Sequence, residues 1–471
     1  MSTPAETVDV EAIAARVREE FSRTLDDLKS LVRIPGVAWD SFDAEDLARS
    51  AEEVAALVRS TGIEDVQILT AEKEGGGTGS PAVVARRPAK AGKPTIMLYA
   101  HHDVQPPGDA SLWNTPAFEP TQVGDRLYGR GAADDKAGIM VHIASLRAVL
   151  NVVEDFGVGV TFFFEGEEEA GSPSFRHFLE KYRDLLVADA IVVADSTNWK
   201  VGTPALTTSL RGVCAAEVEV RVLEHAVHSG MFGGPVLDAP TIAARLISTF
   251  HDDDGAVAID GLVSHESAEV DYPEADFRQD ASVVEGYRLA GKGALADRLW
   301  NKPALSIIGM DIPAVEVSSN TLLPVARFKV SIRLAPGQDT EQAANALTRH
   351  IEAQEVFGAH VTVDITESGQ PFAADTTQPV TQACLWALQQ AWDVAPVQIG
   401  VGGSIPFIAD LRDVFADAQI LVTGVEDPDS RAHSANESLH VGDFERAVTA
   451  EALLLAQMNI QGMSQGAAPV E

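Results

Sequence analysis

Cysteine is scarce in this sequence. The 471 residues include two cysteines, Cys214 and Cys384, which lie far apart and form no Cys-X-X-Cys pair. Two cysteines are too few for a disulfide framework. The sequence therefore suits a reducing compartment, and we expect a cytoplasmic protein.

Long hydrophobic runs are also missing. The longest apolar stretches, such as "IMLYA", "VGVTFFF" and "AIVVA", are far shorter than the roughly 20 residues that cross a bilayer. The first residues are polar and acidic, without the basic and apolar regions of a secretory signal. We expect neither a membrane span nor a secreted protein.

Basic residues are few compared with acidic ones. The 35 lysines and arginines face 70 aspartates and glutamates, which gives a formal net charge of −35. Such a surface repels phosphate backbones, so the charge argues against a nucleic-acid partner. Most of the acidity is that of a well-solvated surface, but a few of the carboxylates could be ligands.

The length and the order of the predicted elements indicate two domains. Apolar spacing near 3.6 predicts helices over 10–32 and 44–60. Short apolar runs at 82–86, 95–100, 158–164 and 190–194 then alternate with helix candidates. This order is typical of an α/β domain with a mostly parallel sheet.

The pattern changes near residue 209. Alternating segments such as "GVCAAEVEVRVL", "PVARFKVSIRLAP" and "HVTVDITESG" flank two helix candidates and predict a smaller α+β unit with an antiparallel sheet. From about residue 372, helix and strand candidates alternate again as they do before residue 209. We therefore predict a discontinuous catalytic domain, 1–208 plus 372–471, with an inserted lid or dimerisation domain over 209–371.

Five histidine or acidic positions follow apolar runs of the larger domain: His101, Asp134, Glu169 in the run of glutamates 167–169, Asp195 and His433. Ligands of open α/β sheets bind at the carboxyl edge of the strands. Imidazoles and carboxylates suit divalent cations, and one carboxylate can bridge two of them. Taken singly, each position has a structural explanation, such as a helix cap or a polar turn. Their convergence favours a metal site.

Eight motifs make the sequence resemble the M20 family of metallopeptidases, the dipeptidase and deacylase group. They occur in family order: "HHDVQP", "LYGRGAADDKAG", "FEGEEEAGS", "VVADS", "HSGMFGG", "SIRLAPG", "GGSIP" and "HSANES". Together they span residues 101 to 438. One match would be weak evidence, whereas eight in order are specific.

The resemblance implies a site for two divalent metal ions, with zinc as the first choice and manganese or cobalt as alternatives. His101 and Asp195 would hold one ion, Glu169 and His433 would hold the other, and Asp134 would bridge the two. The peptide bond after Asp134 is expected to be cis.

Catalytic roles are carried over in the same way. Glu168 would be the general base that takes the proton of a metal-bridging water and delivers it to the leaving amine. Asp103 would accept a hydrogen bond from the far nitrogen of His101. His102 would be a spacer whose side chain points elsewhere.

Four further residues would contact the substrate. His228 is expected to stabilise the oxyanion from the partner subunit of a homodimer, and Arg333 to bind a substrate carboxylate. Thr321 and Ser404 match other substrate-contacting positions.

The function we expect is hydrolysis of the amide bond of dipeptides. The same metal chemistry would serve an alternative, an N-acyl-amino-acid deacylase of the acetylornithine or succinyl-diaminopimelate type. An alternative of another class is a metal-binding module without catalysis, which the presence of both Glu168 and Asp103 disfavours.

Overall fold

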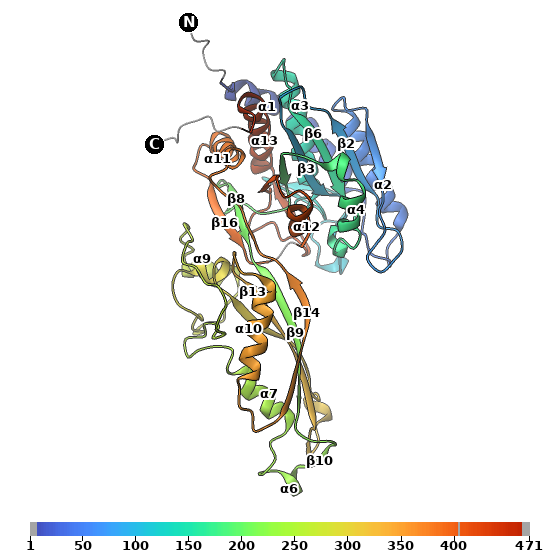
Figure 1. Ribbon diagram of the computed structural model, residues 1–471. Helices are drawn as coiled ribbons and strands as arrows, with labels where there is room; N and C mark the ends of the chain where they lie inside the picture. The colour runs from blue at the N-terminus through green and yellow to red at the C-terminus, as the bar shows by residue number, and fades with distance from the viewer. Residues whose placement is uncertain (1–6, 404–405, 464–471) are drawn as a thin grey trace. The chain divides into compact units, whose positions relative to one another are not determined.

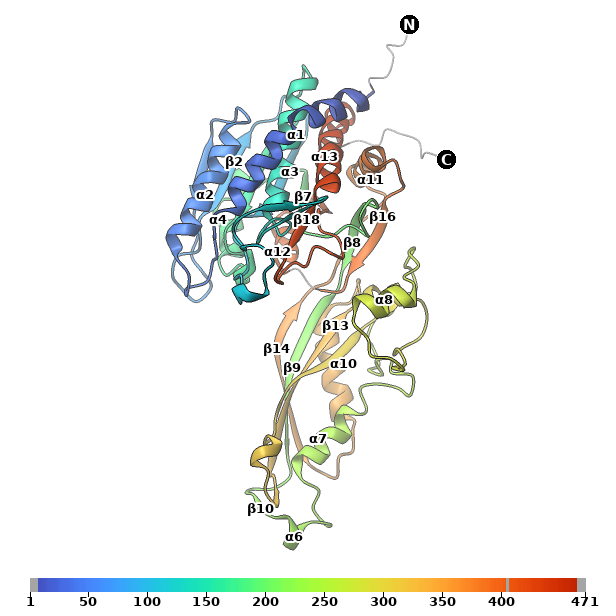
Figure 2. The same cartoon turned by 180° about the vertical axis from the view of Figure 1, so that it is seen from behind.

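The computed structural model describes residues 7–403 and 406–463. The chain forms two compact units, each with its own core (Figures 1 and 2). The first contains Met1–Thr208, Ala374–Ile399 and Asp410–Glu471, and the second contains Ser209–Ala373 and Gly400–Ala409.

The first unit is built on a sheet whose central strands are parallel. Its strands run in the order β1 (Val66–Leu69), β2 (Ala82–Arg87), β6 (Gly159–Glu165), β3 (Thr95–His101), β7 (Ala190–Val193), β17 (Gln419–Val422), β8 (Ala205–Leu210) and β15 (Phe372–Ala373), and β16 (Val397–Val401) also pairs with β8. Strands β6, β3, β7 and β17 pair in parallel, so their carboxyl ends meet at one edge.

Helices cover both faces of this sheet, which is why its central strands are continuously apolar. One face packs against α1 (Val10–Val32), α2 (Ala44–Arg59), α3 (Lys136–Val152), α11 (Pro379–Trp392) and α13 (Val441–Gln461). On the other face, Phe175 of α4 (Phe175–Lys181) packs edge-to-face against Tyr99, and Phe178 stacks on Phe163. Helix α5 (Arg183–Leu186) follows α4, and α12 (Pro406–Val414) spans the boundary between the two units along the chain.

A small three-stranded sheet joins two distant segments of the first unit. Its order is β18 (Ser438–His440), β5 (Arg126–Tyr128) and β4 (Thr121–Val123). Ser438 pairs with Tyr128 in antiparallel register. The loop that follows β5 therefore lies beside the loop that precedes β18.

The second unit has a four-stranded antiparallel sheet in the order β11 (Ala304–Asp311), β13 (Val325–Leu334), β9 (Gly212–Arg221) and β14 (His360–Gly369). Helices α7 (Ala239–Ile247) and α10 (Thr340–Glu352) pack on one face. The remaining elements are a two-stranded ribbon of β10 (Val227–His228) and β12 (Thr321–Leu322), and helices α6 (Ser229–Phe232), α8 (Glu274–Asp280) and α9 (Leu295–Trp300).

The predicted fold class is confirmed: a mixed α/β chain with a mostly parallel main sheet and a separate, smaller antiparallel sheet. The sequence did not predict β11. This edge strand is largely exposed and its register shifts between Ile307 and Gly309, so it lacks a regular alternation of apolar residues. Among the described residues, no helix has the length and apolar character needed to cross a membrane.

Candidate metal centre

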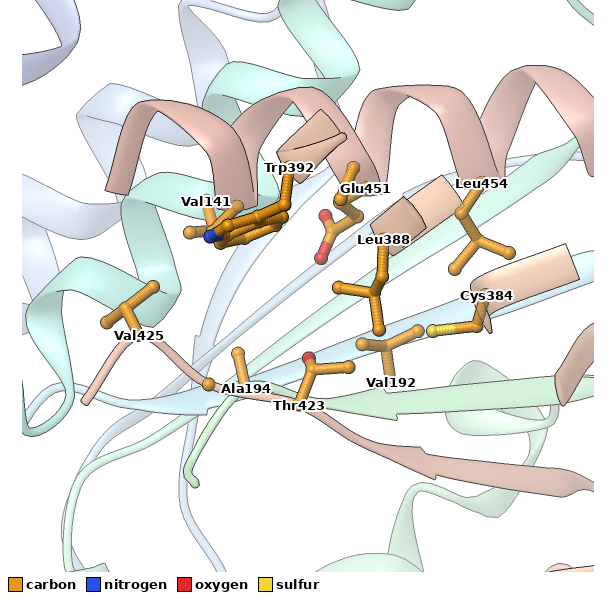
Figure 3. A pocket seen from close by; sticks show the side chains of 13 residues that line it. Val141, Val192, Ala194, Cys384, Leu388, Trp392, Thr423, Val425, Glu451 and Leu454 are labelled. Carbon is orange, nitrogen blue, oxygen red and sulfur yellow. The ribbon is translucent and has the colours of Figure 1, made fainter. Parts of the chain in front are cut away.

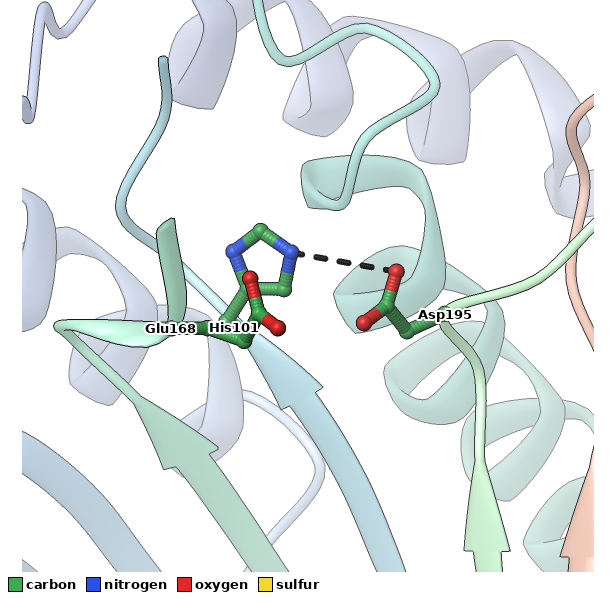
Figure 4. A group of neighbouring side chains, drawn as sticks. All are labelled: His101, Glu168 and Asp195. Atoms are coloured by element: carbon green, nitrogen blue, oxygen red, sulfur yellow. Dashed lines mark ion pairs between the residues drawn. The ribbon is translucent and has the colours of Figure 1, made fainter. Parts of the chain in front are cut away.

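The carboxyl edge of the parallel sheet gathers the first group of candidate ligands. His101 is the last residue of β3, Glu168 lies in the short 3₁₀ helix η2 (Glu168–Ala170) after β6, and Asp195 follows β7. Because β3 pairs in parallel with both β6 and β7, the three side chains converge. One ligand atom from each lies within 4.8 Å of the others (Figure 4).

A second group lies beside the first and comes mainly from loops. Asp134 precedes α3, Glu169 shares η2 with Glu168, and His433 lies between β17 and β18. The His433 Nε2 atom is 3.0 Å from Asp134 Oδ2 and 3.3 Å from Glu169 Oε2. These three residues also offer ligand atoms within 4.8 Å of one another.

The Asp134 carboxylate connects the two groups. Its Oδ1 atom lies 3.1 Å from His101 Nε2, while its Oδ2 atom faces His433. One oxygen is thus directed to each histidine, which is the arrangement that a bridging carboxylate requires. The Asp134–Asp135 peptide bond is cis, as the resemblance implies.

Asp103 forms hydrogen bonds with residues of both groups. Its carboxylate accepts the backbone N–H of Glu168 at 3.2 Å and that of Glu169 at 3.1 Å. The Nδ1 atom of His101 lies 3.1 Å from the Asp103 carbonyl oxygen and 3.4 Å from Oδ1. Asp103 therefore positions the turn that carries the two glutamates as well as the histidine ring.

The protonation behaviour of these groups fits a site for cations. Burial raises the pKa of the Glu168 carboxyl well above its usual range, and the Asp195 charge adds to the effect. Burial likewise raises the pKa of Glu169 to about 7 and that of Asp195 to about 6. Partly buried carboxylates this close together stay ionised at neutral pH only beside positive charge. Two divalent cations bound by these imidazole nitrogens and carboxylate oxygens would supply that charge.

A family model for peptidase family M20/M25/M40 matches residues 97–457. The chain belongs to this family. A cysteinylglycine-S-conjugate dipeptidase from Corynebacterium striatum is 35% identical over 77% of this chain and 80% of its own length. A Beta-Ala-His dipeptidase from Rattus norvegicus is 29% identical over 76% of each chain.

Solved M20 structures have the same fold. Human carnosine dipeptidase 1 superposes with a TM-score of 0.73 over 96% of this chain and 99% of that chain, at 24% identity. A Bacillus subtilis protein described as a dinuclear metal-binding M20 peptidase gives a TM-score of 0.58 over 93% and 98% of the two chains, at 14% identity. The two ligand groups are accordingly the candidate residues for the dinuclear metal site of this M20 metallopeptidase.

His102 is not part of the metal site of this M20 peptidase. Its Nε2 atom lies 2.8 Å from the Pro81 carbonyl oxygen, and His102 belongs to neither ligand group. Burial lowers the pKa of His102 to about 4, so the ring is neutral. The expectation that this side chain points elsewhere is confirmed.

The predicted substrate residues of this M20 peptidase belong to the second unit. His228 and Thr321 face each other across the β10–β12 ribbon, and Arg333 lies on β13 opposite Val213. His228 accepts the Gly230 N–H at Nδ1. Ser404 lies outside the described residues.

Three residues that the sequence did not single out contact the candidate ligands or lie within reach of their charges. Gln105 donates to both oxygens of Glu169, from its backbone N–H at 3.1 Å and from Nε2 at 2.7 Å. Glu426 follows β17; burial and the Asp134 charge raise the pKa of its carboxyl. Glu437 accepts the Asp134 N–H at 3.1 Å. Gln105 and Glu437 stand within the family motifs, which was the available signal.

Proposed function

We propose that this protein hydrolyses the amide bond of dipeptides at a pair of divalent metal ions, with Glu168 as the general base. The observation that carries this proposal is the Asp134 carboxylate, which directs one oxygen to His101 and the other to His433. In addition, the curated relatives reported above are named as dipeptidases.

We assign His101 and Asp195 to one ion, Glu169 and His433 to the other, and Asp134 to both. Glu168 lies close enough to His101 and Asp195 to bind an ion as well. We assign it to proton transfer because the first ion already has a histidine, a terminal carboxylate and the bridging carboxylate.

When bound, two such ions lower the pKa of a water molecule toward neutrality and polarise the scissile carbonyl. Glu168 takes a proton from the attacking water and delivers it to the leaving amine. Its partly buried position suits this exchange, because desolvation raises the pKa of the Glu168 carboxyl and so favours proton uptake. Asp103 keeps Glu168 in reach by accepting its backbone N–H.

Zinc is our first choice of metal, since two imidazoles and three carboxylates without a thiolate are within its usual donor set. Manganese and cobalt accept the same donors. We also place the protein in a reducing compartment such as the cytoplasm, because Cys214 and Cys384 are free and buried.

The second unit would contribute substrate contacts and the dimer interface. We propose that His228 acts from the partner subunit of a homodimer and that Arg333 binds the substrate carboxylate, with Thr321 and Ser404 beside the substrate. The segment after His228 supports association, because Met231 is 74% exposed and its neighbour Phe232 is also exposed.

The test of substrate class uses the protein reconstituted with Zn²⁺, Mn²⁺ or Co²⁺. Each form is assayed against a panel of dipeptides and of N-acetyl and N-succinyl amino acids. Hydrolysis of dipeptides with little turnover of acylated amino acids is expected. Turnover of the acylated compounds alone, at full metal occupancy, would refute dipeptidase activity.

Complementation tests the dimer. His228→Ala and Glu168→Gln should each be inactive alone. If His228 acts in trans, mixing and re-associating the two variants creates some sites that carry both intact residues, and activity returns. Light scattering on the same samples reports the oligomeric state, and a fully active monomer would exclude a residue in trans.

A further inference from the structure

We propose that Glu437 is a positioning residue for the metal centre. Its buried carboxylate ties the loop that carries Asp134 to the loop that carries His433, and so holds the two ligands at bridging distance. This inference rests on the metal assignment of the proposed function, and the experiment below separates the two.

The Glu437 carboxylate organises the loop before α3. Oε2 accepts the backbone N–H of Gly131 at 3.0 Å, and Oε1 accepts those of Ala133 at 2.9 Å and Asp134 at 3.1 Å. The side chain is fully buried. Gly131, Ala133 and Asp134 are buried, so their amides are shielded from solvent. The geometry of the loop therefore depends on this one acceptor.

Arg130 completes the connection. Its Nη1 atom donates to Glu437 Oε2 at 2.7 Å, and its Nη2 atom donates to the Ser434 carbonyl oxygen at 3.2 Å. Ser434 is the neighbour of His433 in the chain. The buried ion pair of Arg130 and Glu437 therefore joins the two loops close to both ligands.

The loop that carries His433 needs such support. Arg431, His433 and Asn436 have φ values of 56°, 61° and 64°, in the left-handed region that non-glycine residues rarely adopt. Such a conformation carries backbone strain and persists only where its surroundings hold it. Asn436 adds a second connection, because its Oδ1 atom accepts the Asn114 N–H at 2.7 Å.

Loss of the Glu437 acceptor should therefore be felt in metal binding. Without it, the amides at Ala133 and Asp134 lose their partner, and Asp134 is free to rotate away from His433. Groups that orient metal ligands typically change metal affinity by 10- to 100-fold. The ion that His433 holds should be affected most, since both of its loop-borne ligands depend on Glu437.

The main variant is Glu437→Gln, which preserves volume but places an amide NH₂ among backbone donors. The metal-free protein is titrated with Zn²⁺ against a competing chelator, and the Co²⁺-loaded protein is examined by visible absorption. We expect one ion to bind 10- to 100-fold more weakly and the Co²⁺ spectrum to change. Neither readout requires turnover.

Glu451→Gln is the matched control. Glu451 is a buried carboxylate of the same unit; it accepts from Ser145 Oγ at 2.6 Å and lies 2.8 Å from His142 Nδ1. Figure 3 shows it among apolar side chains of a pocket between α11, α13 and the sheet. This variant should lose stability and keep wild-type metal affinity, so a general loss of stability cannot imitate the expected result.

Glu437→Asp provides a second variant in case the first does not fold. It keeps the charge beside Arg130 but shortens the side chain by one methylene, so the carboxylate cannot reach all three amides. Affinities within about two-fold of wild type in the folded Glu437 variants would overturn this inference alone. A wild-type protein that binds no pair of ions would overturn the proposed function, and this inference with it.

Discussion

The two histidines of the metal centre are held by different means. His101 ends a central strand, and its neighbours are fixed by the register of β3 with β6 and β7. Its partner Asp195 lies just after β7. Ala194, the residue between β7 and Asp195, donates its backbone N–H to the Tyr99 carbonyl oxygen of β3 at 3.0 Å. In contrast, His433 and Asp134 lie in loops and depend on side-chain contacts.

This difference separates two ways of building a site. Strand ends are positioned by backbone hydrogen bonds and by the core, so the pair His101 and Asp195 should hold its geometry whether or not metal is bound. The loop pair His433 and Asp134 is held by Glu437 and Arg130 and, when an ion is bound, would also be held by that ion. We expect the loop pair to be the more easily displaced.

The largest expected effect is that of replacing Glu168, and it tests whether this residue is a base or a metal ligand. Glu168→Gln should lower kcat by roughly 10²- to 10⁴-fold, because the neutral amide cannot accept the water's proton. Metal content, measured by atomic emission, should stay at two ions. Loss of an ion in this variant would instead make Glu168 a ligand.

The next test compares the two histidines directly. His101→Ala should lower the unfolding free energy of the metal-free protein by roughly 1–3 kcal/mol, because it opens a cavity and leaves buried carboxylates without a partner. His433 has a side chain that is 60% exposed, so His433→Ala should change stability by less than about 0.5 kcal/mol. Urea unfolding checks both, and equal losses would contradict the comparison.

The next prediction concerns Glu165, a buried carboxyl beside His101 in the sheet. It pairs in register with His101, accepts from Tyr99 Oη at 2.6 Å, and has a pKa that burial raises from 4.5 to about 8. The unfolded chain thus releases this proton at lower pH than the folded protein, and the contribution to stability is lost as pH rises from about 4.5 through about 8.

Glu165→Gln should remove that dependence. The slope of unfolding free energy against pH should become shallower by up to about 1.4 kcal/mol per pH unit between those limits. Urea unfolding of the metal-free proteins from pH 5 to pH 8 measures it. Identical slopes for wild type and variant would show that Glu165 does not titrate in this range.

The smallest expected effect is local. Removing metal with a chelator should speed hydrogen exchange in residues 431–436 and in the loop before α3, with little change in β3. The reason is that the loop pair loses one of its supports, whereas the strand keeps its backbone partners. Exchange followed by mass spectrometry measures it, and equal acceleration in β3 would argue against the distinction.

Much of this architecture could be predicted from sequence periodicity. The predicted helix over 10–32 corresponds to α1, and the predicted strands at 95–100 and 158–164 correspond to β3 and β6, each within one residue of the observed bounds. The edge strand β11 could not be predicted, because it is exposed and irregular. Ligand candidates were visible as polar residues that follow apolar runs, although the catalytic roles came from resemblance to a family.

The sequence alone determined which chemical groups stand at the ends of the strands, because hydrophobic patterning and local chain geometry are encoded over a few residues. Only the tertiary structure decided that Asp134 meets both His101 and His433, and that Glu437 supports a residue 303 positions away in the chain. Such contacts depend on how the sheets bring loops together, and no local pattern of residues specifies them.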